Sequence, residues 1–238
     1  VQAMMQRFGV EKDQASRVES TARALLNQVS DVWCLDDPEH ALMLNCACRL
    51  HELGLIVSHG AFHKHGAYIL ANADMPGFSR QQQALLGALV RVHRRKFVDQ
   101  EFALVPARVR EYARRLAVLL RLAALVHRGR SGSQRPPLTI HADGSRIQVE
   151  FEDRWLSKHP LTEAEIAREA EYLAAAFPGC TRNKAQTMPG HRGHRLQADL
   201  PQDIGQQEDN HGQHHCPHSL STHNTIAFQH GWHPIKPK

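Results

Sequence analysis

The spacing of apolar residues over the first 126 positions restricts this chain more than any other feature of its sequence. Apolar side chains recur every three or four residues over 15–29, 43–50, 85–90 and 109–123. That interval is the repeat of an amphipathic helix, whereas a half-buried strand alternates at every second residue. Because the connecting segments are short, we predict a compact helical bundle rather than a coiled coil.

Residues that favour helix termini mark the boundaries of these segments. Asp13 and Asp37-Pro38 precede the first two, and Ser79, with a glutamine three residues later, precedes the third as a capping box. Gly54 is expected to end the second helix, and Pro106 to begin the longest one.

The composition changes at Arg128–Pro137, where Gly, Ser, Arg and Pro cluster, and we place a domain boundary there. Beyond it, 138–142 and 146–151 flank an Asp-Gly pair, which predicts a hairpin. A helix capped by Thr162 and Glu165 is expected next. One hairpin and one helix make a thin unit, so we expect it to lean on the bundle.

The last part of the chain is rich in His, Gln, Gly and Pro and shows neither a helical nor a strand period. Such a segment buries too little apolar surface to offset its ordering entropy, so we predict disorder. It contains a cluster that could chelate a soft divalent ion, although its spacing matches no structural zinc site. The cluster is His211, His214, His215, Cys216 and His218.

The predicted fold class is therefore mainly α. A helical bundle occupies residues 1–130, a small α+β domain 131–180, and a disordered His-rich tail 181–238. No run of about 18 uncharged apolar residues is present, so no transmembrane segment is expected. No signal peptide is visible after Val1, and five cysteines without a C-x-x-C pair suit a reducing cytoplasm.

The residues between 51 and 96 carry the chemistry. This stretch holds six basic residues, two acidic residues and five histidines. Two interpretations stay open, an anion-binding surface and an ordinary solvated basic face. The basic run at 94–96 also follows the end of a predicted helix, where the helix dipole alone favours cations.

A metal site is a further hypothesis for the same stretch. His51-Glu52 at a helix end, followed by histidines, is how HD-type metal phosphohydrolases gather their ligands. Such a site needs a carboxylate from a distant helix, but Ala124 stands where it would be expected and His127 is the nearest alternative. The ligand set is incomplete, so we predict no metal ligand in this chain.

The stretch resembles the HD-like helical domain of the exopolyphosphatase / guanosine pentaphosphate phosphohydrolase (Ppx/GppA) family. The resemblance covers roughly residues 1–177 and is most specific over 50–96. Leu119–Ala123 and Trp155–Ala176 resemble later segments of that family. The most specific matches are Leu50-His51-Glu52-Leu53-Gly54, Ser58-His59, His63-Lys64-His65, Ala67-Tyr68, Asp74-Met75-Pro76-Gly77-Phe78-Ser79 and Val92-His93-Arg94-Arg95-Lys96.

The resemblance implies a two-part enzyme. Family members first carry two actin-like domains, whose Gly-rich loops hold phosphate and whose acidic residues bind Mg²⁺ and activate water. No such loop is present here, so we expect a C-terminal fragment that contains no catalytic residue and is inactive alone. The resemblance also implies a closing strand after the last helix, and we expect none in the polar residues that follow Phe177.

The function implied is substrate binding and homodimer contact in an exopolyphosphatase-type hydrolase. That hydrolase would release terminal phosphate from inorganic polyphosphate or guanosine pentaphosphate, and no nucleic-acid partner is expected. Arginine and lysine suit phosphate oxygens, and histidines would gain charge as the pH falls, so weaker binding is expected at higher salt and higher pH. The predicted polyphosphate-binding residues are His51, His59, His63, Lys64, His65, Arg91, His93, Arg94, Arg95 and Lys96.

Two other functions stay open, a self-sufficient HD-type metal phosphohydrolase acting on a nucleotide and a non-enzymatic helical interaction module. Single residues have structural interpretations too. His51 can simply hydrogen-bond a helix end, and His93 can be a satisfied histidine of the core.

Overall fold

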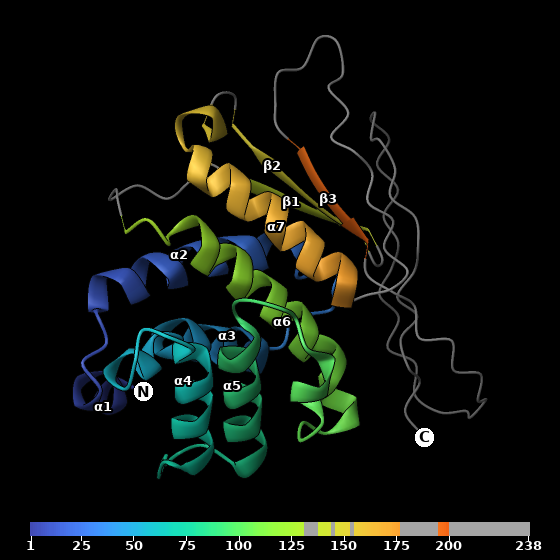
Figure 1. Cartoon of the computed structure of the whole chain (residues 1–238). Helices are drawn as coiled ribbons and strands as arrows, with labels where there is room; N and C mark the ends of the chain where they lie inside the picture. Colours follow the sequence, from blue (N-terminus) through green and yellow to red (C-terminus); the bar gives the residue numbers. More distant parts are fainter. Residues whose placement is uncertain (131–137, 144–145, 153–154, 177–194, 200–238) are drawn as a thin grey trace, which may run out of the picture.

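The computed structural model describes residues 1–130, 138–143, 146–152, 155–176 and 195–199. The helices are α1 (Gln2–Arg7), α2 (Lys12–Val29), α3 (Pro38–Leu50), α4 (Phe62–Asn72), α5 (Arg80–Val92), α6 (Ala107–Val126) and α7 (Pro160–Ala176). Short 3₁₀ turns are η1 (Leu53–Ile56), η2 (Asp99–Phe102) and η3 (Leu156–Lys158), and the strands are β1 (Leu138–Asp143), β2 (Arg146–Phe151) and β3 (Arg195–Asp199). The predicted mainly α class is confirmed (Figure 1).

Several predicted caps are confirmed. Asp37 Oδ1 accepts a hydrogen bond from the Glu39 N–H at 2.8 Å, with Pro38 in the first turn of α3. The Ser79 capping box forms both of its reciprocal bonds at the start of α5. These bonds satisfy amide groups that have no partner within the helix.

Three predicted boundaries are wrong. Helix α2 begins at Lys12 with no side-chain cap, so Asp13 lies in its first turn. Helix α3 ends at Leu50, and Gly54 belongs to η1 instead. Helix α7 begins at Pro160, ahead of Thr162, because proline fits the first turn, where its missing N–H costs no helical bond.

Helix α6 is the centre of the bundle. Every residue from Arg115 to Ala123 is buried, although the apolar period predicts burial of one face only. The reason is that α6 contacts α2, α3 and α5 on the bundle side and α7 on the other (Figure 1). A helix covered all round is a core element.

Helix α4 has no counterpart among the predicted segments. Its buried residues are His63, Gly66 and Leu70, which have helical spacing but include only one large apolar side chain. The helix packs very closely on η1, since a Cβ placed on Gly54 would lie 2.0 Å from the Phe62 carbonyl oxygen and 2.5 Å from the Gly66 amide nitrogen.

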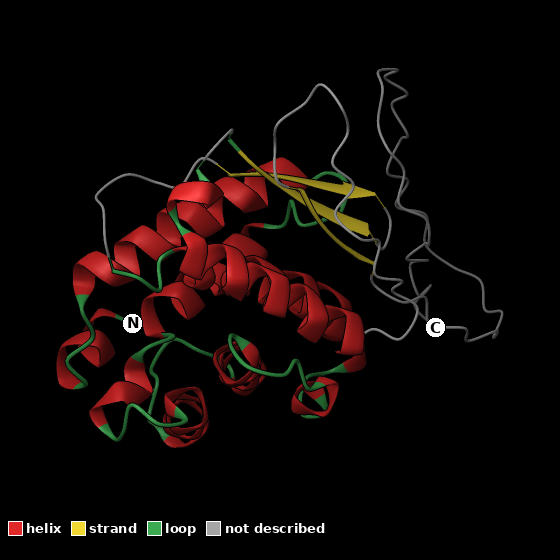
Figure 2. Cartoon of the chain, turned by 45° about the horizontal axis from the view of Figure 1, so that its top comes forward, coloured by secondary structure: helices red, strands yellow, loops and turns green. Residues whose placement is uncertain are grey.

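The strands form one antiparallel sheet in the order β1-β2-β3, on one side of the helices (Figure 2). The predicted hairpin pairs Leu138 with Phe151 and Asp143 with Arg146. The hairpin packs against α2, where Gln28 Oε1 accepts a hydrogen bond from the Ile140 N–H at 2.9 Å. Helix α7 packs on α6 and β3.

The expectation of no strand after the last helix is wrong for Arg195–Asp199, which pairs with β2. The five residues alternate polar and apolar types, a period too short to stand out within a polar segment. The predicted disorder of the rest of the tail, and its His-Cys cluster, lie outside the described residues. No helix within the described ranges is long and apolar enough to cross a bilayer.

Candidate functional site

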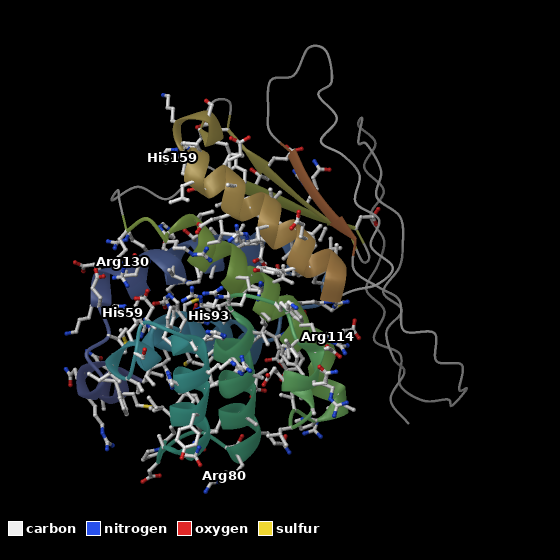
Figure 3. The ribbon with its side chains drawn as sticks, viewed as in Figure 1. His59, Arg80, His93, Arg114, Arg130 and His159 are labelled. Atoms are coloured by element: carbon white, nitrogen blue, oxygen red, sulfur yellow. The ribbon has the colours of Figure 1, made fainter. Side chains whose placement is uncertain are left out.

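A pocket of about 230 Å³ opens where the ends of α3, α5 and α6 meet η1 and the first turns of α2 and α4. Figure 3 shows His59, His93 and Arg130 on this side of the molecule, whereas Arg80 and Arg114 lie away from it. The lining residues are Gln14, His51, Glu52, Leu55, His59, Phe62, His93, Arg94, Ala124, Arg128 and Arg130.

Two buried histidines share one arrangement at the back of this pocket. His51 directly follows α3 and His93 directly follows α5. The Nδ1 of each lies 2.7 Å from the carbonyl oxygen three residues earlier, that of Cys48 and that of Val90. A carbonyl oxygen only accepts, so Nδ1 carries the hydrogen, and the Nε2 of the neutral ring keeps a lone pair. The two rings meet edge to face with centroids 5.4 Å apart.

Burial keeps these rings neutral. It lowers the pKa of His51, and burial together with the neighbouring His51 ring holds the pKa of His93 well below its usual value. Burial and the charges of nearby arginines, Arg91 first, lower the pKa of His63 to about 4. The expectation that the histidines gain charge in mild acid, and so strengthen anion binding, is wrong for His63, and the lowered pKa of His51 and of His93 opposes it for those two rings.

Three arginines reach the pocket, and they differ in their partners. Arg128 pairs with Glu165 at 2.5 Å, and Arg130 pairs with Glu52 at 2.7 Å and also with Glu11. The guanidinium of Arg94 instead lies over the Phe62 ring, 4.5 Å from its centroid.

Within the described part of the chain, no carboxylate lies within ion-pair distance of Arg94. Burial and the positive charges of Arg128 and Arg95 lower its pKa from the usual arginine value. A cation that is partly buried beside other cations is stabilised by an incoming anion.

The structure brings four of the ten predicted binding residues to the pocket: His51, His59, His93 and Arg94. His63 lies just behind, with its ring centroid 6.3 Å from that of His93, and its Nδ1 has no hydrogen-bond partner among the described residues. The structural interpretations of His51 and His93 hold for one nitrogen of each ring, because both residues are buried and the Nδ1 of each is bonded to a helix end.

The other predicted binding residues do not line the pocket. Lys64, Arg95 and Lys96 are exposed, and His65 is half-buried on α4. Arg91 pairs with Glu101 of η2 at 2.8 Å.

Sequence reasoning missed Arg128 and Arg130, which the composition assigns to a linker. Their contribution depends on the end of α6 returning to His51, and no local pattern reports this. It also missed Gln14, whose side-chain amide donates to the carbonyl of His127 at 2.8 Å and is almost fully buried.

The geometry also bears on the metal hypothesis. Ala124 lies on the pocket wall, so the position expected for a distal carboxylate carries only a methyl group. His127 lies 2.8 Å from the Thr21 hydroxyl through its Nε2. No group of three or more His, Cys, Asp or Glu side chains that could hold a metal ion occurs in the described ranges. Mg²⁺ requires oxygen ligands, and the carboxylate lining the pocket, Glu52, is paired with Arg130, so the described residues do not fit this ion.

Part of this sequence is similar to known proteins. A family model described as "Ppx/GppA phosphatase, domain III" matches residues 1–170. A protein of Vibrio vulnificus named guanosine-5'-triphosphate,3'-diphosphate pyrophosphatase is 32% identical over 170 residues, covering 71% of this chain and 33% of the relative. Proteins of the same name from Pseudoalteromonas atlantica and Pseudoalteromonas translucida are 33% identical over 165 residues and 30% over 174.

These alignments cover 69% and 73% of this chain and 33% and 35% of the two Pseudoalteromonas relatives. The chain thus spans about a third of the length of the curated relatives it matches. The resemblance predicted over roughly residues 1–177 is confirmed over residues 1–170, and the chain belongs to the Ppx/GppA phosphatase family, with these residues corresponding to its domain III.

Proposed function

We propose that this chain is the substrate-binding and dimerisation part of a phosphohydrolase that releases terminal phosphate from guanosine pentaphosphate or inorganic polyphosphate. The observation that carries the proposal is the pocket in which the Arg94 guanidinium, without a carboxylate partner among the described residues, lies beside Arg128 and Arg130. Hydrolysis would depend on groups outside this chain, so the chain alone is expected to be inactive.

The charge pattern supports a polyanionic substrate. Arg94 can bind two phosphate oxygens at once, and the exposed Lys64, Arg95 and Lys96 would contribute charge outside the pocket. The relatives' name favours guanosine pentaphosphate over polyphosphate, since guanosine-5'-triphosphate,3'-diphosphate is that nucleotide.

Two further parts of the proposal concern the whole protein. Any Mg²⁺ would be bound outside the described residues, because these contain no group of three or more His, Cys, Asp or Glu side chains placed to hold a metal ion. The whole protein would act in the cytoplasm, which rests on the cysteine pattern of the sequence.

Dimerisation is supported by exposed apolar side chains. Ile56 is 60% exposed, Val57 57% and Tyr68 71%, and all three lie on η1, α4 and the turn between them. Analytical ultracentrifugation of the chain and of Tyr68→Glu tests this part. A dimer that the substitution dissociates is expected, and a monomer at all concentrations contradicts it.

The binding proposal is tested by titrating guanosine pentaphosphate and tripolyphosphate into the full chain at low and at physiological salt. We expect affinity to fall with salt, and Arg94→Ala to weaken binding about tenfold or more, the effect of losing a charge-assisted hydrogen bond. Arg80→Ala is the control, because Arg80 begins α5 at the end far from the pocket (Figure 3). An affinity that does not change with the salt concentration contradicts the proposal. Failure of both ligands to bind contradicts it as well.

A self-sufficient HD-type metal phosphohydrolase and a purely structural interaction module are the competing functions. The methyl group of Ala124 in the pocket wall weighs against the first. A stoichiometric divalent ion after gel filtration, together with phosphatase activity, would revive it. Dimerisation without any phosphate binding would favour the second.

A further inference from the structure

The back of the pocket presents hydrogen-bond acceptors, which a phosphate group does not need. The Nε2 lone pairs of His51 and His93 have no hydrogen-bond partner among the described residues. Beside them, Glu52 uses Oε1 to accept from Arg130, and Oε1 lies 4.0 Å from His51 Nε2. Phosphate oxygens are themselves acceptors and carry negative charge. A ligand that fills this part of the pocket must therefore bring N–H or O–H donors.

The same pocket also holds donors. The guanidinium of Arg94 lies at its wall and is not committed to a carboxylate in the described part of the chain. The ligand must therefore offer acceptors as well as donors. Guanine does so, with N–H groups at N1 and N2, which a carboxylate accepts as a pair, and with acceptors at O6 and N7, which arginine binds bidentately. Adenine has no hydrogen on N1, no amino group at C2 and no oxygen at C6.

Size and shape agree with a base. A volume of about 230 Å³ lies just below the range of roughly 300–1,000 Å³ typical of sites for whole small molecules. The half-buried Phe62 ring on the wall, with Arg94 above it, provides flat groups of the kind on which bases stack.

We infer that this pocket binds the guanine base of a guanine nucleotide, with Glu52 accepting from the N–H edge and Arg94 donating to the acceptor edge or to the adjoining phosphate. The inference rests on the proposed function, because it assigns one part of that substrate to this pocket. It also separates the two candidate substrates, since inorganic polyphosphate contains no group that the acceptors could bind.

The test compares ligands that differ only in the base. The full 238-residue chain is titrated calorimetrically with GDP, ADP, inosine diphosphate and tripolyphosphate. We expect GDP to bind about ten to a hundred times more tightly than ADP, the effect of two hydrogen bonds to a charged acceptor. Inosine diphosphate, which lacks the amino group at C2, should fall between them.

Substitution of the carboxylate then identifies the residue. Glu52→Gln should reduce the preference for GDP over ADP to less than about threefold, while tripolyphosphate binds no more weakly than before. Glu19→Gln is the matched control, because Glu19 also pairs with an arginine at 2.7 Å and is exposed to nearly the same extent, 13% against 11% for Glu52. The control should keep the full preference.

A second variant covers the case in which Glu52→Gln alters the fold, which circular dichroism would reveal. Ala124→Leu extends a side chain from the pocket wall and should weaken the binding of GDP about tenfold or more by removing space. Equal affinities for GDP and ADP, or a preference that survives both substitutions, overturn the inference. Salt-dependent binding of tripolyphosphate without any preference for a base overturns the inference and leaves the proposed function standing. If none of the ligands binds, both the inference and the proposed function are overturned.

Discussion

Arg121 of α6 and Glu169 of α7 form an ion pair inside the protein, with Arg121 Nη2 2.8 Å from Glu169 Oε2 and both side chains buried. The same guanidinium donates to the carbonyl oxygens of Val92 and Arg95. Arg95 has a positive φ of 65°, which is unfavourable for a residue with a side chain, and this bond holds its carbonyl in place. One side chain therefore joins the end of α5, the centre of α6 and the final helix.

Removing the acidic partner should be strongly destabilising. Glu169→Ala leaves a buried guanidinium without its counterion, and we expect the free energy of unfolding to fall by about 3–5 kcal/mol. Urea denaturation measures the change. Glu165→Ala is the control, because it breaks the more exposed Arg128–Glu165 pair and should cost at most about 1 kcal/mol. Equal costs for the two variants would contradict the structural role given to Arg121.

A second prediction follows from the close contact between η1 and α4. A methyl group on Gly54 would meet the backbone of Phe62 and Gly66, which cannot move aside without separating η1 from α4. We expect Gly54→Ala to lower the free energy of unfolding by about 3 kcal/mol or more. Gly60→Ala is the matched substitution, since the nearest atom to its added methyl group is the Ser58 Oγ at 3.6 Å. It should change stability by less than about 0.5 kcal/mol, and similar losses from both variants would argue against the close contact.

The fold was predictable wherever local chemistry decides it. The stripes Ala15–Val29 and Met43–Leu50 are buried as their period requires, and the caps at Asp37 and Ser79 form because a side-chain oxygen satisfies a free amide whatever surrounds it. Helix α4 and strand β3 escaped prediction because tertiary contacts maintain them. The first buries a histidine and a glycine, and the second relies on pairing with β2.

The pocket was predictable only in part for the same reason. His51, His93 and Arg94 belong to one stretch of unusual residue types, so the sequence identifies them together. Arg130 reaches Glu52 across 78 positions, and that approach depends on the packing of α6 against α2 and α3. The protonation of the histidines depends on burial, which the sequence does not report for a residue at a helix end.

Burial of neutral histidines predicts how stability depends on pH. Two of them, His63 and His127, have a pKa lowered to about 4 in the folded protein, mainly by burial, against about 6.5 in an unfolded chain. Between these values the unfolded chain binds more protons, so the free energy of unfolding should rise as the pH rises from about 4 to about 6.5 and then level off.

Urea midpoints measured across that range test the sign. His127→Gln should make the rise less steep, because it removes one of the groups whose protonation favours the unfolded chain. A wild-type midpoint that stays constant from about pH 4 to about 6.5, or an unchanged slope in the variant, would contradict neutral burial of these rings.

Phe62 should affect anion binding only by ordering the Arg94 guanidinium that stacks on it. Phe62→Leu removes the flat surface under the guanidinium, so the Arg94 side chain becomes less ordered and must lose more conformational freedom when it binds a phosphate. In an otherwise wild-type chain, we expect Phe62→Leu to lower the affinity for tripolyphosphate about threefold. In a chain that already carries Arg94→Ala, the same substitution should change the affinity little.

This double-mutant cycle separates positioning from general damage to the fold. The Phe62 ring also lies 5.5 Å from that of His93, so a loss of packing could weaken binding through the pocket as a whole. In that case Phe62→Leu would lower affinity by the same factor whether or not Arg94 is present. Non-additive effects would instead show that the ring acts on the ligand through the guanidinium that it supports.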